Sequence, residues 1–345
     1  MKAVVIHGPK QISIDDVPIK EPGQGEALIK VMAAGLCGTD YELYTNDMVY
    51  IKEGLSKLPL IPGHEWSGVV VRTGPGVSSF QAGDKVSGEC TVNCQKCWYC
   101  ARGINNQCKD RTETGIMNRD GGFAEYITFP ISHLHRFSSL SFEEASLIEP
   151  TGIALYALMR GKIAPFDNVV IMGPGPVGLQ AAQIARKVFR AKKVILAGTR
   201  PERLERATGF GLDGLINIRQ EDIAEKVRTY TGGQMADLVI EASGGATVFQ
   251  DIKKIINPCG RIVLNGFFGS KAAPIDWDFI TVNDISIIGA LGSPNIWDNV
   301  IDLLESGIIE TKCLISHIMK LDEFEKGLDM MVNRRENACK VILKP

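Results

Sequence analysis

Four cysteines are spaced closely enough to bind a single metal ion. Cys94, Cys97, Cys100 and Cys108 form a C-x2-C-x2-C-x7-C motif. Four thiolates from one loop can surround Zn²⁺ tetrahedrally, and four cysteines can also hold an iron–sulfur cluster. Cys90, four residues before the motif, is an alternative ligand, but the regular spacing favours leaving it out.

Three further segments contain residue types suited to an open metal site. They are Cys37 in Gly-Leu-Cys-Gly-Thr-Asp, His64-Glu65 in Gly-His-Glu, and Glu149 in Glu-Pro. Thiolate, imidazole and carboxylate are the ligands of catalytic zinc. Each residue also has a structural explanation: a buried thiol, a capping histidine, or a carboxylate that precedes a helix. The segments lie too far apart for their spacing alone to show that they converge.

A glycine-rich turn connects an apolar strand, Val169 to Met172, with a helix that extends to about Arg190. The turn consists of Gly173-Pro174-Gly175-Pro176-Val177-Gly178. It satisfies the G-x-G-x-x-G pattern, in which glycines permit a tight turn and close approach to a pyrophosphate, and the helix N-terminus supplies amides and a positive dipole. The turn therefore predicts a dinucleotide site, and a neighbouring domain of this kind favours structural zinc over iron–sulfur at the four cysteines.

The next strand, Val194 to Ala197, indicates which dinucleotide is bound. An acidic residue at its end would accept hydrogen bonds from the ribose hydroxyls of NAD, whereas this chain has Gly198-Thr199-Arg200. A hydroxyl and a guanidinium suit the 2′-phosphate of NADP. NADP is therefore favoured over NAD, although Arg200 could simply face solvent at a helix start. Ser243, beyond the strand Leu238 to Glu241, is a further candidate cofactor contact.

The surrounding elements indicate two kinds of fold. Up to about residue 137, short β-rich runs alternate with glycine and proline: Met1 to His7, Gln11 to Ile19, Glu26 to Met32, Trp66 to Val71 and Phe123 to Phe129. From Asn168 onward, strands alternate with helices, which predicts a doubly wound parallel sheet. The four remaining strands of this sheet are Leu215 to Ile218, Leu238 to Glu241, Ile262 to Asn265 and Ile285 to Ile288. A last helix, Asn295 to Gly307, precedes strand-like ends near Leu314 and Val341.

Length and charge narrow the classes of function. The chain has 345 residues, enough for two domains, and a net charge of −2, so no basic field favours nucleic acid or membrane lipid as a partner. No apolar run approaches the ~20 residues of a membrane-spanning helix, and the first residues resemble a strand rather than a signal peptide. We therefore expect a cytoplasmic protein that acts on a small molecule.

These motifs resemble the zinc-containing medium-chain dehydrogenase/reductase family. The similarity covers essentially the whole chain and includes GHEWSG from Gly63, GDKV from Gly83, GGFAEY from Gly121, the four-cysteine loop and the glycine-rich turn. It implies an α/β protein with a GroES-like, β-rich catalytic domain, residues 1–150 and 291–345, and a Rossmann dinucleotide-binding domain, residues 151–290. We expect ligands in the cleft between the domains.

The Glu149-Pro150 pair resembles the branch of sorbitol, threonine and glucose dehydrogenases. By this resemblance, Cys37 and His64 bind a catalytic zinc, and Glu65 and Glu149 complete the shell directly or through water. Thr39 matches the hydroxyl that relays the proton of the alcohol. The family often has a histidine where this chain has Glu42, so the proton leaves through Glu42, a ribose hydroxyl or water.

The resemblance implies hydride transfer between a polyol or sugar-type secondary alcohol, or its ketone, and NADP or NAD, with one catalytic and one structural Zn²⁺ per subunit. Threonine or an amino alcohol is an alternative substrate. A zinc-independent reductase and a non-catalytic nucleotide sensor are alternative functions, disfavoured by the complete set of metal ligands. A homodimer or homotetramer is usual in the family, and Ile285 to Ile288 could pair across a two-fold axis.

Overall fold

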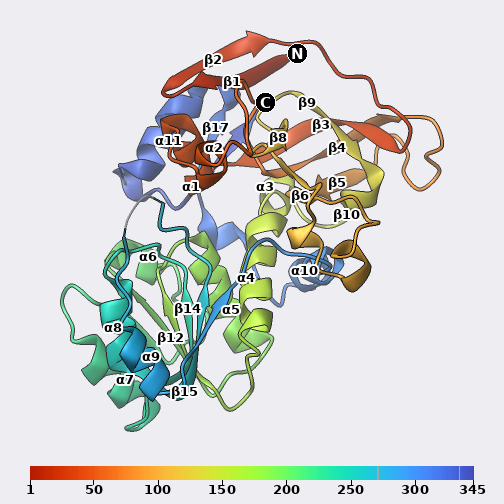
Figure 1. The fold of residues 1–345 in the computed structure, drawn as a ribbon. Coiled ribbons are helices and arrows are strands. Elements are labelled where there is room, and N and C mark those ends of the chain that lie inside the picture. The colour runs from red at the N-terminus through yellow and green to blue at the C-terminus, as the bar shows by residue number, and fades with distance from the viewer. Residues whose placement is uncertain (270–271, 334) are drawn as a thin grey trace. The chain divides into compact units, whose positions relative to one another are not determined.

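The computed structural model describes residues 1–269, 272–333 and 335–345. It divides into two compact units (Figure 1). The first contains Met1–Glu149, Gly292–Ser306 and Thr311–Pro345, and the second contains Pro150–Leu291 and Gly307–Glu310. The first unit therefore combines both ends of the chain.

The first unit is built from three antiparallel or mixed sheets. The largest has seven strands in the order β10-β5-β4-β3-β18-β17, with β9 paired to β3. Its strands are β3 (Glu26–Gly35), β4 (Glu65–Thr73), β5 (Lys85–Gly88), β9 (Tyr126–Pro130), β10 (Leu134–Arg136), β17 (Ile315–Lys320) and β18 (Lys340–Lys344). The smaller sheets contain β1 (Lys2–Gly8) with β2 (Gln11–Asp16), and β6 (Thr91–Val92), β7 (Thr112–Thr114) and β8 (Asn118–Arg119).

The core of this unit lies against the seven-stranded sheet. Trp66, Phe123 and Phe129 are fully buried in one cluster with side chains from β3 and from the C-terminal segment. Short helices complete the unit: α1 (Gly38–Thr45), α2 (Val49–Lys52), α3 (Phe142–Ala145), α10 (Trp297–Glu305) and α11 (Phe324–Val332). The chain returns to this core after the second unit, because β18 pairs antiparallel with β3 at Ile342 and Gly35.

The second unit contains the predicted parallel sheet, with six strands in the order β13-β12-β11-β14-β15-β16. They are β11 (Asn168–Met172), β12 (Lys193–Gly198), β13 (Gly214–Asn217), β14 (Ala236–Glu241), β15 (Ile256–Leu264) and β16 (Ser286–Gly289). Every residue of β11 is buried, as expected for a central strand covered on both faces. The helices are α5 (Pro176–Lys187), α6 (Pro201–Glu205), α7 (Ile223–Thr231), α8 (Val248–Ile255) and α9 (Trp277–Val282), and α4 (Ile148–Arg160) enters this unit at Pro150.

The six predicted strands are all present, and most begin or end within one or two residues of the prediction. The exception is β15, which starts at Ile256, six residues before the predicted Ile262. Pro258 and Gly260 interrupt the apolar pattern there and concealed the start of the strand. The predicted helix Asn295 to Gly307 is confirmed as the shorter α10.

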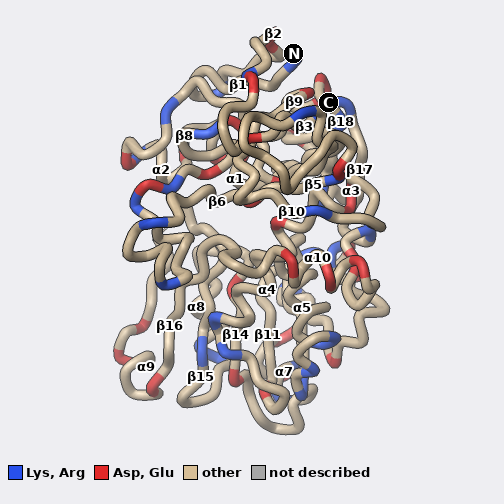
Figure 2. Tube along the Cα trace, turned by 90° about the vertical axis from the view of Figure 1, so that its right-hand side faces the viewer, with Lys and Arg blue, Asp and Glu red and all other residues tan. Residues whose placement is uncertain are grey.

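Charged residues of both signs occur along each unit, as Figure 2 shows. This distribution agrees with the net charge of −2. Within residues 1–269, 272–333 and 335–345, each helix is too short or too polar to span a lipid bilayer.

A histidine with two carboxylate partners links α10 to the sheet of the first unit. His135, on β10, lies 2.9 Å through Nε2 from Glu89 Oε1 and 2.7 Å through Nδ1 from Asp298 Oδ1. Its ring stacks on Trp297. Burial disfavours the charged ring, but hydrogen bonds to Glu89 and Asp298 outweigh it and raise the pKa of His135. The protonated ring donates both bonds, so protonation strengthens the attachment of α10.

This attachment predicts a pH-dependent stability. Because the pKa of His135 is raised in the folded protein, its contribution is complete below the ordinary histidine pKa and is lost as pH rises through the folded value. We expect His135→Asn to lower the free energy of unfolding by about 1 kcal/mol near pH 6 and by less near pH 8.5. Denaturant unfolding at both pH values measures the difference, with His7→Asn, an exposed histidine on β1, as the control. An equal loss at both pH values would contradict the assignment.

Candidate active site

Cys37, His64 and Glu65 converge in the first unit. One ligand atom from each lies within 4.8 Å of the others. Cys37 precedes α1, and Glu65 begins β4, where it pairs with Gly35 at the end of β3. The register between β3 and β4 therefore brings Glu65 close to Cys37, which lies 28 residues earlier in the chain. A Cβ on Gly35 would overlap the Glu65 carboxylate, so this position needs glycine.

The cluster has the composition of a zinc site. It offers a thiolate, an imidazole nitrogen and a carboxylate, which are the ligand types of catalytic zinc. His64 Nδ1 and Asp40 Oδ1 are buried 3.8 Å apart and have no hydrogen-bond partner among the described residues. Buried polar atoms are ordinarily satisfied. Both atoms are therefore available to a bound ion or to its other ligands.

The charges around His64 also favour a cation. Burial opposes protonation of the ring, but the facing Cys37 and Asp40 outweigh burial and raise the pKa of His64 well above its usual range. Burial raises the pKa of Asp40 to about 6, against the opposing effect of His64. Negative groups therefore surround the histidine, and a zinc ion would supply the positive charge that the ring otherwise takes up as a proton.

Glu149 lies outside the set of atoms that meet within 4.8 Å. It is buried in the first turn of α4 and 5% exposed. Burial is the largest cause that raises its pKa to about 7; Glu65 adds to this effect and His64 opposes it. Glu149 thus interacts electrostatically with Glu65 and His64, but its carboxylate is not among the atoms that lie within 4.8 Å of one another.

Thr39 and Glu42 both lie on α1. Thr39 Oγ1 is 3.8 Å from Cys37 Sγ, so the hydroxyl predicted to relay a proton stands beside the thiolate. Glu42 is half-buried one turn further along the helix, and its carbonyl accepts hydrogen bonds from Asp47 and Met48 N–H groups.

A buried lysine that we did not predict completes the surroundings of Glu65. Lys340, on β18, is 2% exposed, and its Nζ lies 2.7 Å from each Glu65 oxygen and donates to Leu36 O at 2.9 Å. The sequence feature that could have drawn attention to Lys340 is its position at the start of an apolar C-terminal strand. Nothing in the sequence connects that lysine with a glutamate 275 residues away.

The four-cysteine loop forms a second cluster. Sγ atoms lie 3.5 Å apart for Cys97 and Cys100, 3.8 Å for Cys97 and Cys108, and 4.0 Å for Cys94 and Cys100. Tetrahedral Zn–S bonds of about 2.3 Å place sulfurs about 3.8 Å apart, so the loop has the geometry of a closed zinc site. All four are free thiols, and the Cys100 N–H is the largest cause that lowers the pKa of Cys97 to about 6.

Cys90 does not belong to this second cluster. Burial is the largest cause that raises the pKa of its thiol, and Glu149 and Cys37 contribute through their charges. Cys90 therefore lies near the cluster of Cys37 rather than in the structural loop.

The glycine-rich turn of the second unit connects β11 to α5. Gly175 is the N-cap of α5, Pro176 and Val177 begin the helix, and Gly178 packs so closely on the Gly173 carbonyl that a Cβ would overlap it. Pro176 is suited to the first helical position because its missing N–H has no helical partner there. Free N–H groups at the start of α5 can bind a phosphate.

The other cofactor candidates follow strands of the same sheet. Thr199 and Arg200 come directly after β12, and Arg200 precedes α6. Ser243 follows β14, and its N–H and hydroxyl both donate to Glu241 Oε1. Because carboxyl ends of parallel strands meet at one edge of a sheet, these residues belong to the edge where α5 begins. Glu241, which we did not predict, is buried there with Oε2 unpartnered among the described residues.

Comparison with known proteins identifies the family. Residues 23–139 match the alcohol dehydrogenase GroES-like domain, and residues 176–306 match the zinc-binding dehydrogenase family. Sorbitol dehydrogenase from Bacillus subtilis is 34% identical over 100% of this chain and 97% of its own.

Two crystal structures share the fold. A short chain alcohol dehydrogenase from Escherichia coli CFT073, complexed with NADH, is 32% identical, with a TM-score of 0.90 over 100% of this chain and 99% of its own. A putative zinc-binding dehydrogenase from Sinorhizobium meliloti 1021, bound to NADP, is 28% identical, with the same TM-score and coverage. The predicted combination of GroES-like and Rossmann folds is confirmed, and the chain belongs to the zinc-containing medium-chain dehydrogenase/reductase family.

Proposed function

We propose that the protein transfers a hydride between a polyol or sugar-type secondary alcohol, or its ketone, and a nicotinamide dinucleotide, with NADP preferred to NAD. The convergence of Cys37, His64 and Glu65 within 4.8 Å carries this proposal. The similarity to a sorbitol dehydrogenase supports the substrate class. The catalytic domain would be residues 1–150 and 291–345, and the dinucleotide-binding domain residues 151–290.

Cys37 and His64 hold the catalytic zinc in this proposal, with Glu65 and Glu149 as further ligands, directly or through water. When bound, zinc supplies a Lewis acid that lowers the pKa of an alcohol hydroxyl, and the dinucleotide accepts the hydride. Thr39, next to Cys37, accepts the hydroxyl proton and passes it toward solvent. Cys94, Cys97, Cys100 and Cys108 hold a structural zinc.

Lys340 positions Glu65 in this scheme. Its Nζ contacts both carboxylate oxygens, and both side chains are buried. The lysine therefore compensates the buried charge of Glu65 and fixes the position of its carboxylate.

The cofactor is bound in the second unit by Gly173, Gly175, Pro176, Val177 and Gly178 at the pyrophosphate, and by Ser243. Thr199 and Arg200 bind the 2′-phosphate of NADP. The absence of a carboxylate directly after β12 supports this choice, because a carboxylate there would repel the phosphate.

We further propose a cytoplasmic homodimer or homotetramer. Cysteines that remain free thiols and cluster as metal ligands support a reducing compartment. The edge strand β16 supports subunit pairing, since a strand with one unpaired edge can extend a sheet across a two-fold axis.

Substitutions at the two clusters should have different effects. We expect Cys37→Ser or His64→Ala to lower kcat about 1000-fold, because several kcal/mol of Lewis-acid stabilisation are lost, while the free energy of unfolding and dinucleotide binding change little. Cys97→Ser should instead lower the melting temperature. Steady-state kinetics, metal analysis and thermal unfolding separate the two effects. If the first two variants lost activity only by unfolding, the division into catalytic and structural metals would be wrong.

Lys340→Met leaves Glu65 as an unpaired buried charge, so the free energy of unfolding should fall by ~3 kcal/mol. Adding Glu65→Gln removes that charge and should recover part of the loss. Denaturant unfolding of the two single variants and the double variant measures the coupling. Additive losses would show that the ion pair has no such role.

Arg200→Ala should lower kcat/KM for NADP about tenfold or more, because a charge-assisted hydrogen bond is lost, and leave kcat/KM for NAD nearly unchanged. Arg203→Ala, on the following helix, is the matched control. An unaltered ratio of the two kcat/KM values in Arg200→Ala, or a wild-type preference for NAD, would remove Arg200 from this role.

A further inference from the structure

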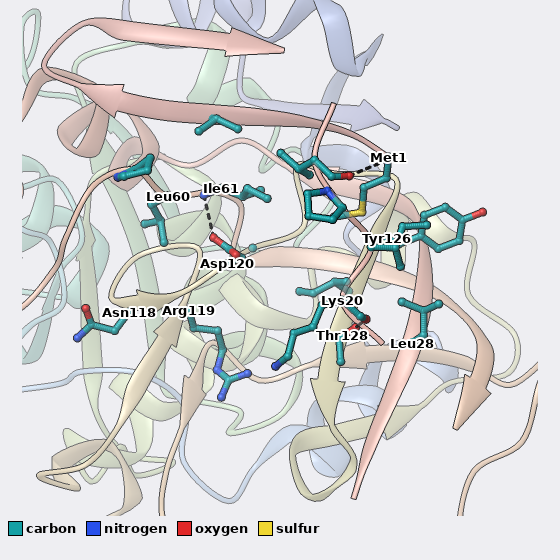
Figure 3. A pocket seen from close by; sticks show the side chains of 17 residues that line it. Met1, Lys20, Leu28, Leu60, Ile61, Asn118, Arg119, Asp120, Tyr126 and Thr128 are labelled. Carbon is teal, nitrogen blue, oxygen red and sulfur yellow. Dashed lines mark hydrogen bonds between the residues drawn. The ribbon is translucent and has the colours of Figure 1, made fainter. Parts of the chain in front are cut away.

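The first unit contains a cavity that none of the proposed steps uses. It has a volume of about 550 Å³ and is lined by Met1 and β1, by the segment 17–20 that follows β2, by β3 and β9, and by the segments 59–61 and 118–121 (Figure 3). This volume falls within the range of sites for small molecules. None of the proposed metal ligands contributes to the lining.

One part of the lining is apolar and firmly packed. Val5, Leu28 and Ile61 line the cavity and are themselves at least nine-tenths buried. Val17 and Ile19, from the segment that follows β2, add further apolar surface. These walls can bury a short hydrocarbon group, which water solvates poorly.

The charged side chains of the lining are two cations and one carboxylate, and the N-terminal ammonium of Met1, which donates to Val17 O at 2.8 Å, adds a third positive charge. Figure 3 shows the charged ends of Arg119 and Lys20 pointing toward the same side of the cavity. Arg119 Nε donates to Thr112 Oγ1 at 2.8 Å, which fixes the guanidinium. The carboxylate, Asp120, accepts the Ile61 N–H through Oδ1 at 3.1 Å. The lining therefore has an excess of positive charge.

Arg119 lacks a counter-ion. Throughout the part of the chain that the structure describes, the two terminal nitrogens of its half-buried guanidinium have no hydrogen-bond or ion-pair partner, and the guanidinium carbon lies 5.8 Å from the centroid of the Phe129 ring. Burial lowers the pKa of Arg119, against the raising effect of Glu26. Lys20 Nζ contacts Glu26 only at 3.4 Å, and the Lys20 side chain is 71% exposed. A fixed guanidinium with two free nitrogens matches the geometry of a carboxylate.

We propose that this cavity binds a small monocarboxylate with an apolar body, at a site separate from the catalytic cluster. The carboxylate lies on Arg119 and Lys20, and the apolar body lies against Val5, Leu28 and Ile61. A carboxylate offsets part of the excess positive charge of the lining, and the volume accommodates a chain of several carbons. Free alcohols fit less well, because they leave the guanidinium unpaired.

Hexanoate is the probe, titrated by calorimetry into the zinc-loaded enzyme. We expect Arg119→Gln and Lys20→Gln to weaken hexanoate binding, the former about tenfold or more, and Lys254→Gln, an exposed lysine of the second unit, to leave it unchanged. Hexanamide, which lacks the charge, should bind much more weakly to the wild type. Equal affinity for hexanamide, or wild-type affinity in both cavity variants, would overturn the proposal.

Two further variants keep the test decisive. Val17→Trp keeps both cations and narrows the apolar part of the cavity, so it should weaken hexanoate binding even if Arg119→Gln fails to fold. Cys37→Ser should bind hexanoate as the wild type does, because it alters only the metal cluster. Loss of binding in Cys37→Ser would place the carboxylate at the zinc and overturn the proposal, and so would undiminished binding in Val17→Trp.

Discussion

The pairing of β3 with β4 on one side and β18 on the other is the constraint on which the catalytic cluster depends. Gly35 pairs with Glu65 on β4 and with Ile342 on β18. This arrangement brings together Cys37, Glu65 and Lys340 from three distant parts of the sequence. A shift of one residue in either pairing would turn side chains to the opposite face of the sheet. The ligand set is therefore a consequence of strand register.

Burial then determines the electrostatics of the cluster. Glu65, Glu149 and Lys340 are each at most 5% exposed, so their charges interact strongly and water screens them little. Asp40 and Glu149 both have raised pKa values because of burial. The protein keeps several acidic groups around one imidazole and a single buried ammonium group. A divalent cation is the species that best balances this arrangement.

Local patterns were sufficient to predict much of the fold and part of the site. The four cysteines lie within 15 residues, and their sulfurs meet as their spacing predicts. The glycine-rich turn lies between β11 and α5, and strand periodicity located the six parallel strands. In these cases the residues that determine the structure are neighbours in the chain.

Interactions between distant residues could not be predicted in this way. No feature of the sequence around Lys340 identifies Glu65 as its partner. Likewise, nothing around His135 identifies Asp298, which lies 163 residues later. The convergence of Cys37 with His64 was inferred from family resemblance alone, because spacing left it open. Single charged residues carry no local signal of their partners, so only the packed structure reveals which of them meet.

The segment from Leu60 to His64 contributes to two regions of the first unit: Leu60 and Ile61 line the cavity, and His64 belongs to the metal cluster. Leu60 N–H donates to Ile6 O, and Gly121 N–H donates to Ile61 O. Phe123 N–H donates to Pro62 O, and the next residues are Gly63 and the ligand His64. The segment 60–62, which includes part of the cavity wall, is thus hydrogen-bonded to β1 and to the segment 121–123. Because these bonds are short-range and directional, they anchor the backbone of the segment that immediately precedes His64 in the chain.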